Sequence, residues 1–259
     1  MERAGGIGTF HVLFYFAISA GCNNLRAFLN HMIPFLIQKQ VYKCQLVDDV
    51  AGVLPALDVI AHDEICTQEN ICAGDARILS WAVDFSNDRS LHNWVEQLDL
   101  MCEPEWKGGL LGTAFYFSWC LALLVIPRLA DKIGRKWLFL VSRLVECVLF
   151  LATLCIRSYW GMFALLCALG VAAAGRINVG TVFMTEWCQR KHQTKVHMLS
   201  QTGLSITLLS CVIFYWVVSD ETMYVSGFGY VLCLVTTGLA FVVPESPRLL
   251  VAQGKTAEV

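Results

Sequence analysis

Two charged residues, spaced as neighbours on a helix, flank a glycine between two long apolar stretches. Asp131 and Arg135 are four positions apart, Gly134 lies between them, and Lys136 follows. A tight turn at Gly134 places the carboxylate beside the guanidinium group, since glycine adopts backbone conformations that other residues avoid. Partial dehydration strengthens such an ion pair, so it can close one conformation and break in another. The alternative is that Arg135 and Lys136 contact anionic lipid headgroups.

A second set of polar residues interrupts the apolar stretches themselves. A charge inside a membrane-spanning segment is unfavourable by roughly 2.5–3.5 kcal/mol, so these residues are candidates to line a substrate path. The candidates are Asn23, Asn24, Arg26, Arg176 and Asn178. For Arg26 the alternative is snorkelling to the headgroups. Glu146 is a weaker candidate, because Arg143 one turn earlier predicts a satisfied pair on the same helix.

The other residue patterns argue against an enzyme and against a nucleic-acid-binding protein. The sequence has no Gly-rich phosphate loop, no Ser/His/Asp set and no paired-carboxylate site. The formal net charge is −2, and no run of Lys and Arg is long enough to follow a phosphate backbone. We therefore expect no catalytic residues, no cofactor, no metal and no nucleic-acid partner.

The composition is that of a membrane protein. Of the 259 residues, 56% are hydrophobic and 15% are charged, whereas soluble domains have about 45–50% and about 25%. A membrane-spanning helix needs roughly 20 apolar residues. Six segments meet this requirement, at about 10–37, 109–129, 138–156, 159–182, 199–219 and 223–243. The sequence predicts an all-α membrane protein with a six-transmembrane-helix bundle; buried helices of a soluble protein are the alternative.

Basic residues gather on one side of this predicted bundle. Its connections and tail on that side hold Arg128, Lys132, Arg135, Lys136, Arg190, Lys191, Lys195, Arg248 and Lys255. The short connections on the opposite side hold Arg157 alone. Because cytoplasmic loops carry the excess of Lys and Arg, we expect both termini in the cytoplasm of a multi-pass protein of the plasma membrane.

The same topology makes residues 38–108 an extracellular loop, with thirteen acidic and five basic residues and a net charge of −8. It holds the four cysteines Cys44, Cys66, Cys72 and Cys102, which can form two disulfides in any of three connectivities. A zinc site is the weaker alternative, because the spacing does not fit. The other eight cysteines lie within or beside spans, where a thiol acts as a small hydrophobic group.

Five motifs follow one another from residue 95 onward. They are Asp99, Leu100 and Cys102 before the second span; Leu129, Asp131, Gly134, Arg135 and Lys136 after it; Arg176 with Gly180; Glu186 at the start of the next loop; and Pro244-Glu245-Ser246-Pro247-Arg248. With these motifs in this order, the chain resembles the organic cation/anion transporter family of the major facilitator superfamily. Pro127 replaces the first glycine of the second motif, Lys132 its usual arginine, and Gln193 an arginine of related sugar carriers.

The resemblance implies a fold and roles for named residues. It implies half of a major facilitator fold, divided into residues 1–37 (N-terminus and first helix), 38–108 (extracellular loop), 109–243 (helices two to six) and 244–259 (start of the central cytoplasmic loop). It implies an inner gate made of Asp131, Gly134, Arg135, Lys136, Glu186, Glu245 and Arg248. It also implies that first and fourth spans face the substrate path whereas third spans pack peripherally. This again makes Glu146 a weaker candidate for the substrate path.

Carriers of this superfamily use two six-helix bundles that rock against each other. We expect the chain to be the N-terminal half of a carrier of small organic ions, with membrane lipid around it and a second bundle as a possible partner. The sign of the substrate stays open, because the acidic loop would enrich cations whereas Arg26 and Arg176 would favour anions. The alternative is a truncated, non-transporting membrane protein that associates with full-length carriers or binds ligand through its extracellular loop.

Overall fold

The computed structural model describes residues 32–47, 61–74, 78–87, 90–186, 190–217 and 222–242. The chain divides into two compact units. One holds the long helices from Gly109 onward, and the other holds residues 34–108 together with 220–222. The fold is mostly helical, with one small β-sheet.

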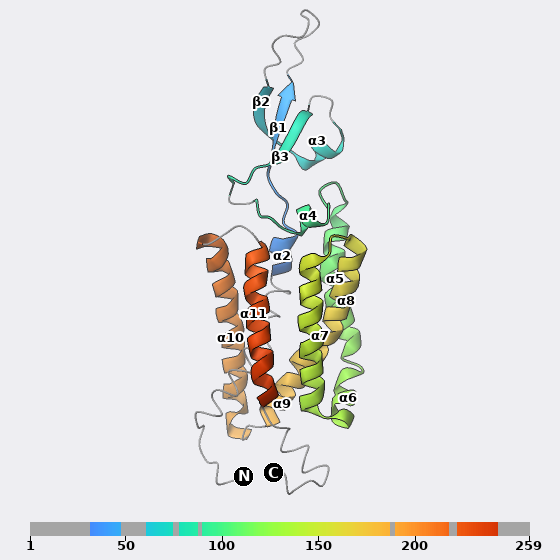
Figure 1. The fold of residues 1–259 in the computed structure, drawn as a ribbon, viewed down its shortest axis with the longest axis vertical. Helices are drawn as coiled ribbons and strands as arrows, with labels where there is room; N and C mark the ends of the chain where they lie inside the picture. The colour runs from blue at the N-terminus through green and yellow to red at the C-terminus, as the bar shows by residue number, and fades with distance from the viewer. Residues whose placement is uncertain are drawn as a thin grey trace, which may run out of the picture. The chain divides into compact units, whose positions relative to one another are not determined.

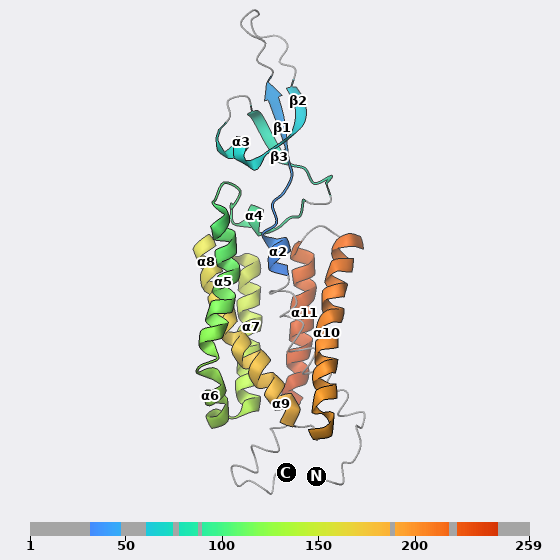
Figure 2. The ribbon, with the colours of Figure 1, turned by 180° about the vertical axis from the view of Figure 1, so that it is seen from behind.

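Long helices make up the first unit and run lengthwise beside one another (Figure 1, Figure 2). In chain order they are α5 (Glu105–Ala122), α6 (Ile126–Ile133), α7 (Arg135–Cys155), α8 (Tyr159–Ala173), the π-helix η3 (Ala174–Val179), α9 (Gly180–Glu186), α10 (Arg190–Val217) and α11 (Thr222–Val242). Short α2 (Met32–Leu36) precedes them in the chain. The elements α8, η3 and α9 follow one another without a break.

Two of the described helices are long and apolar enough to cross a membrane, Arg135–Cys155 and Tyr159–Glu186. A third candidate is α5 with α6, a pair bent by 48°. These helices cover the predicted segments 138–156, 159–182 and 109–129. The segments 199–219 and 223–243 fall largely on α10 and α11, and 10–37 lies mostly outside the described residues. The described part of the chain thus supplies two or three spans, and six remains a prediction.

The bend between α5 and α6 lies next to a proline. The chain leaves the helix after Ala122 and re-enters it at Ile126, so Pro127 stands in the first turn of α6. Proline is tolerated there because the first amides of a helix have no partner inside the helix. The residue that departs from the family pattern thus begins a new helical segment.

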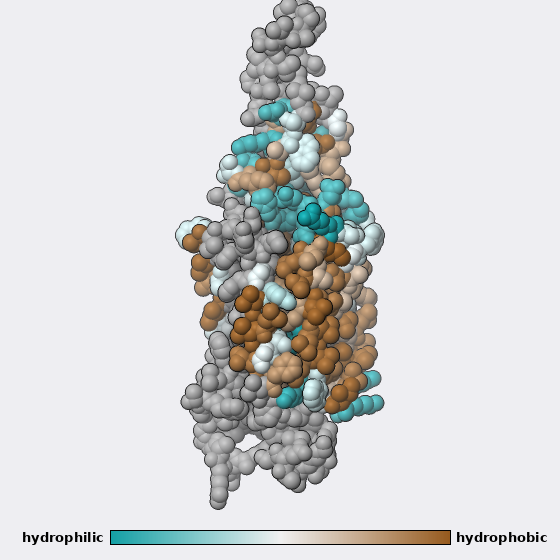
Figure 3. Space-filling model, viewed as in Figure 1, coloured by the Kyte–Doolittle hydropathy of each residue, from teal (hydrophilic) through white to brown (hydrophobic). Residues whose placement is uncertain are grey.

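Helix α7 has an exposed apolar face and a buried face that carries polar and charged residues. One face exposes large apolar side chains, Trp137, Val141, Leu144, Val145, Val148 and Leu151. The opposite face is buried and carries Phe139, Ser142, Arg143, Glu146, Cys147 and Phe150. Apolar side chains gather over the long helices on the face seen in Figure 3. An apolar outer face with polar groups inside is the arrangement that lipid surroundings favour.

Two glycines let neighbouring helices approach closely, as their small size predicts. A Cβ atom at Gly170 would collide with the Phe115 carbonyl oxygen and the Ser118 hydroxyl of α5, and one at Gly175 with the Ser142 hydroxyl of α7. Small residues permit this backbone approach between membrane helices. At Gly227 of α11, by contrast, a Cβ atom would meet nothing within 4 Å among the described residues.

The second unit contains an antiparallel sheet that the sequence reasoning did not predict. Its strands β1 (Tyr42–Val47), β2 (Ala61–Cys66) and β3 (Ile78–Val83) are arranged with β1 in the centre (Figure 1). In β1, buried Tyr42 and Cys44 alternate with exposed Lys43 and Gln45, the period of a half-buried strand. Two short helices, α3 (Gln68–Cys72) and α4 (Trp94–Gln97), complete the unit. The all-α expectation therefore holds for the long helices and not for residues 38–108.

Candidate substrate path and inner gate

A buried ion pair joins α7 to the π-helix in the helical unit. The Nε atom of Arg176, in η3, lies 2.5 Å from the Oε2 atom of Glu146 in α7, and both side chains are 0% exposed. A guanidinium nitrogen of Arg143 lies 3.8 Å from the same Glu146 oxygen. The predicted pair of Arg143 and Glu146 is thus present, but Arg176 is the closer partner of Glu146. A π-helical turn within an α-helix often marks a functional site.

Arg143 extends this buried cluster to α11. Its guanidinium group donates to the carbonyl oxygen of Cys233 at 3.1 Å and to the hydroxyl oxygen of Thr236 at 2.5 Å. The Thr236 and Thr237 hydroxyls also donate to the Cys233 carbonyl, at 3.1 and 2.7 Å. Three helical elements, α7, η3 and α11, therefore meet around Arg143, Glu146 and Arg176. Buried polar groups are retained in such interiors when they are hydrogen-bonded or paired.

Asn178 lies two residues beyond Arg176 in the same π-helix and is half-buried. Its Nδ2 atom is buried and has no hydrogen-bond partner among the described residues. The structure therefore brings two of the five substrate-path candidates, Arg176 and Asn178, into one short segment. The other three, Asn23, Asn24 and Arg26, lie outside the described residues.

A second ion-pair cluster lies at the turn between α6 and α7. Gly134 takes a φ of 116° there, which L-residues with a side chain rarely adopt. Arg135 donates to the Oδ1 atom of Asp131 at 2.9 Å and also forms an ion pair with Glu186 at the end of α9. Asp131 is 63% exposed, whereas Glu186 is only 10% exposed. Arg135 thus connects the ends of α6, α7 and α9 by charge.

The remaining candidates for the inner gate are only partly described. Lys136 follows Arg135 and is half-buried. Gln193, which stands where sugar carriers place arginine, donates to the Thr185 carbonyl oxygen at 3.1 Å, next to Glu186. Glu245 and Arg248 lie outside the described residues. The structure therefore brings Asp131, Gly134, Arg135 and Glu186 together, and the other members stay predictions.

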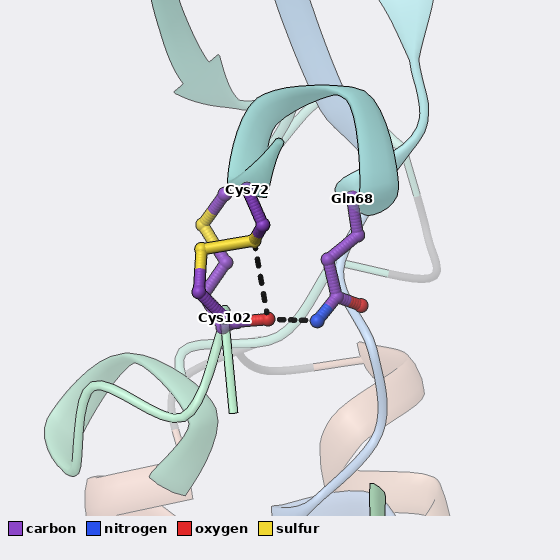
Figure 4. The surroundings of a disulfide bond; sticks show 4 residues. Gln68, Cys72 and Cys102 are labelled. Atoms are coloured by element: carbon purple, nitrogen blue, oxygen red, sulfur yellow. Dashed lines mark hydrogen bonds between the residues drawn. A yellow bond between two sulfur atoms is a disulfide. The ribbon is translucent and has the colours of Figure 1, made fainter. Parts of the chain in front are cut away.

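The four cysteines of the second unit form two disulfides, Cys44–Cys66 and Cys72–Cys102. The first joins β1 to the end of its neighbour β2. The second joins α3 to the segment after α4, and Gln68 donates beside it to the Met101 carbonyl oxygen (Figure 4). Among the described residues, no group of three His, Cys, Asp or Glu side chains is placed to hold a metal ion. The sequence left three connectivities open, and this is one of them.

Two ionisable groups of the sheet unit have shifted pKa values. The ammonium group of Lys43 lies 2.9 Å from Asp84, and its hydrogen bond holds the pKa of that carboxyl below the usual value of 3.8. Burial raises the pKa of Tyr42, and the carboxylate of Glu96 adds to this shift. Lys43 and Asp84 therefore stabilise the centre of the sheet by a charged contact.

Sequence reasoning missed the contact between Glu146 and Arg176. It placed Glu146 lower because third spans pack peripherally in the family and because Arg143 offered a nearer partner. The signal that could have found the contact is the presence of opposite charges in two consecutive apolar segments, since each charge needs a partner inside a membrane. The position of the π-helix, which sets the direction of the Arg176 side chain, has no sequence signature.

The chain is similar to a known protein family and to several known proteins. Residues 105–258 match the model of the family described as Major Facilitator Superfamily. Solute carrier family 22 member 16 of Bos taurus is 25% identical over 178 residues, which are 66% of this chain and 30% of the relative. Member 7 of Homo sapiens is 29% identical over 185 residues, 69% of this chain and 32% of the relative. Member 1 of Oryctolagus cuniculus is 26% identical over 169 residues, 63% of this chain and 29% of the relative. The chain thus spans about 30% of the length of these relatives.

Proposed function

Because the chain belongs to the major facilitator superfamily, a family of multi-pass membrane transport proteins and not of enzymes, we propose that it carries small organic ions across a membrane. It does so by alternating access, as one six-helix bundle that works against a second bundle. The similarity to several solute carriers of family 22 supports a transport role, and the class of small organic ions comes from the resemblance of the sequence motifs. The predicted spans 10–37, 199–219 and 223–243 complete the proposed bundle.

The observation that carries the proposal is the position of Arg135 between Asp131 and Glu186. It joins the ends of three helical elements by ion pairs, one exposed and one nearly buried. Such contacts hold a closed arrangement and can be exchanged when a bundle moves, because packed interfaces switch between discrete arrangements and their ion pairs re-form with other partners. We propose that Asp131, Arg135 and Glu186, with Lys136, Glu245 and Arg248, form the gate on the cytoplasmic side.

The substrate path is proposed to pass the buried polar residues of the bundle. Arg176 and Asn178 share the π-helix, and Glu146 sets the position of the Arg176 guanidinium group. Asn23, Asn24 and Arg26 of the first span face the same path in the proposal. The excess of basic residues on one side supports cytoplasmic termini and a position for residues 38–108 on the opposite side of the membrane. The proposal places the protein in the plasma membrane, so that residues 38–108 are extracellular.

Uptake into cells that express the 259-residue chain tests the proposal. The probes are a labelled quaternary ammonium ion and a labelled aromatic carboxylate, supplied to cells with the chain alone and with a matching second bundle co-expressed. Uptake of either probe above that of untransfected cells supports the proposal, and uptake only with the second bundle identifies a half-carrier. The absence of uptake in both arrangements contradicts it and favours the non-transporting alternative.

A matched pair of variants tests the gate. Arg135→Ala removes the ion pairs to Asp131 and Glu186, and we expect uptake to fall about tenfold, the effect of a coupling free energy of about 1.4 kcal/mol. Arg128→Ala removes the positive charge of an exposed side chain of α6, near Arg135 in the sequence, and should leave uptake nearly unchanged. Equal losses in the two variants would mean that only the positive charge of this segment matters.

A further inference from the structure

Two cysteines that are 86 positions apart in the sequence touch inside the helical unit. The sulfur of Cys147, in α7, lies 2.7 Å from the sulfur of Cys233, in α11. Both residues are buried, with 4% and 1% of their surface exposed. Disulfide sulfurs are about 2.05 Å apart, so a relative movement of about 0.7 Å would bring these two to bonding distance.

The contact is held in place by neighbouring hydrogen bonds. Arg143, one turn before Cys147, donates to the Cys233 carbonyl oxygen and to Thr236. The hydroxyl of Thr237 lies 3.6 Å from the Cys147 sulfur. Since residues 143 and 147 of α7 pair with 236 and 233 of α11 in reverse order, the two helices run antiparallel. Contacts over about one turn of each helix therefore fix the cysteines side by side.

Three other free thiols, in α5, α7 and α8, have different surroundings. Cys120 and Cys155 are exposed and Cys167 is half-buried. None of these three contacts a second thiol within the described residues. The proximity of Cys147 and Cys233 is thus a specific feature of the boundary between α7 and α11.

We propose that Cys147 and Cys233 are a redox modification site, where a peroxide converts the two thiols into a reversible disulfide that cross-links α7 to α11. Both S–H bonds break and one S–S bond forms, so the thiols give up two electrons and two protons. Hydrogen peroxide accepts both electrons as its O–O bond breaks, and with the two protons it leaves as two water molecules. A dithiol reductant reverses the step by thiol–disulfide exchange.

The cross-link would lie one turn from the charged cluster. Arg143 and Glu146 both precede Cys147 in α7, and Arg143 already reaches across to α11. A covalent bond at this point keeps α11 against the face of α7 that carries both charges. The bond is independent of which substrate the protein carries, and the site stands or falls separately from the proposed transport activity.

Peptide mapping of the full chain in membranes provides the test. The membranes are treated with hydrogen peroxide, remaining thiols are blocked with N-ethylmaleimide in denaturant, and the chain is digested without reduction. Chymotrypsin suits the sequence, because cleavage after Phe150 separates Cys147 from Cys155 and cleavage after Tyr230 separates Cys233 from Cys211. We expect mass spectrometry to find a peptide of Cys147 linked to a peptide of Cys233, and dithiothreitol to release it.

Variants give the matched controls. Cys147→Ser should abolish the linked peptide and leave Cys233 blocked by N-ethylmaleimide, whereas Cys155→Ser on the same helix should leave the linked peptide in place. Should a variant not fold, the unmodified chain still decides the matter. Complete blocking of both Cys147 and Cys233 after peroxide treatment, or a link from Cys233 to a different cysteine, would overturn the proposal.

Discussion

Arg176 and Glu146 form an ion pair of 2.5 Å between the π-helix and α7, and neither side chain has exposed surface. The pair joins two consecutive long helices at a depth that water does not reach. Removing one partner of a buried pair leaves the other charge in a poorly solvating environment, which is more destabilising than replacing both. The pair is therefore structural and, in the proposed function, holds Arg176 at the substrate path.

Glu146→Gln should lower the stability of the helical unit. The change removes the negative charge next to the Arg176 and Arg143 guanidinium groups, and we expect the free energy of unfolding to fall by about 3–5 kcal/mol. Unfolding in mixed detergent micelles measures the loss. Val145→Ala, at the neighbouring exposed position of α7, is the control and should change stability by no more than about 0.5 kcal/mol.

The double variant with Arg176→Gln separates a true pair from two independent effects. If Glu146 and Arg176 stabilise each other, the free energy of unfolding of the double variant should fall by less than the sum of the two single losses, with a coupling free energy of about 0.5–3 kcal/mol. Losses that simply add would show that the 2.5 Å contact carries no energy of its own.

The two carboxylates that pair with Arg135 should contribute unequally to the free energy of unfolding. Asp131 is 63% exposed and Glu186 is 10% exposed, and water weakens exposed pairs. Asp131→Asn should therefore lower the free energy of unfolding by less than about 1 kcal/mol, and Glu186→Gln by about 1.5–3 kcal/mol. Unfolding of the two variants in the same detergent measures the difference, and a larger loss in Asp131→Asn would refute this ordering.

The long helices could be predicted from the sequence, but the sheet could not. Runs of apolar residues gave the ends of three spans to within about four residues, because a lipid environment demands such runs. These spans are α5 with α6, α7, and the continuous segment from α8 to α9. Strand β1 has the sequence YKCQLV, whose alternation is short and includes polar residues. It forms because Tyr42 and Cys44 pack inward once β2 and β3 lie beside it, which depends on contacts distant in the sequence.

Some contacts of the site residues could be predicted from the sequence and others could not. Asp131, Gly134 and Arg135 are close in the chain, so their spacing predicts contact. Arg135 reaches Glu186 only because α7 and α9 pack together, and the family resemblance supplied that expectation. The sequence indicates that Arg176 needs an acidic partner inside the membrane, but it does not predict the direction of the Arg176 side chain, since a π-helix changes the direction of every side chain after its extra residue.

The disulfides should account for much of the stability of the sheet unit. Their separations in the sequence are 22 and 30 residues, for which loop-closure entropy predicts about 3–4 kcal/mol each. Replacing Cys72 and Cys102 together by alanine should speed hydrogen exchange of the β1 amides in the full chain by about 100- to 1,000-fold. Unchanged protection in β1 would show that the sheet holds without this bond, and replacement of Cys120, which forms no disulfide, is the control.

The sheet unit should lose stability in acid. The folded pKa of Asp84 is lowered by its hydrogen bond to Lys43, so the stabilisation is full above the unfolded pKa and is lost as the pH falls through the lower folded value. Protection of β1 and β3 amides, corrected for intrinsic exchange rates, should therefore begin to fall below a pH of about 4. Asp84→Asn should reduce this dependence, and an identical pH profile in the variant would contradict the assignment.

Position 170 in α8 influences the position of the Arg176 charge in the π-helix that follows. Because it has no Cβ atom, Gly170 allows α8 to lie against the backbone of α5. A methyl group would force the two helices apart and draw Arg176, less than two turns further on, out of line with Glu146. The absence of a Cβ atom at position 170 thus sets the alignment of the Arg176 and Glu146 charges. A larger residue at this position would move the two charges out of alignment.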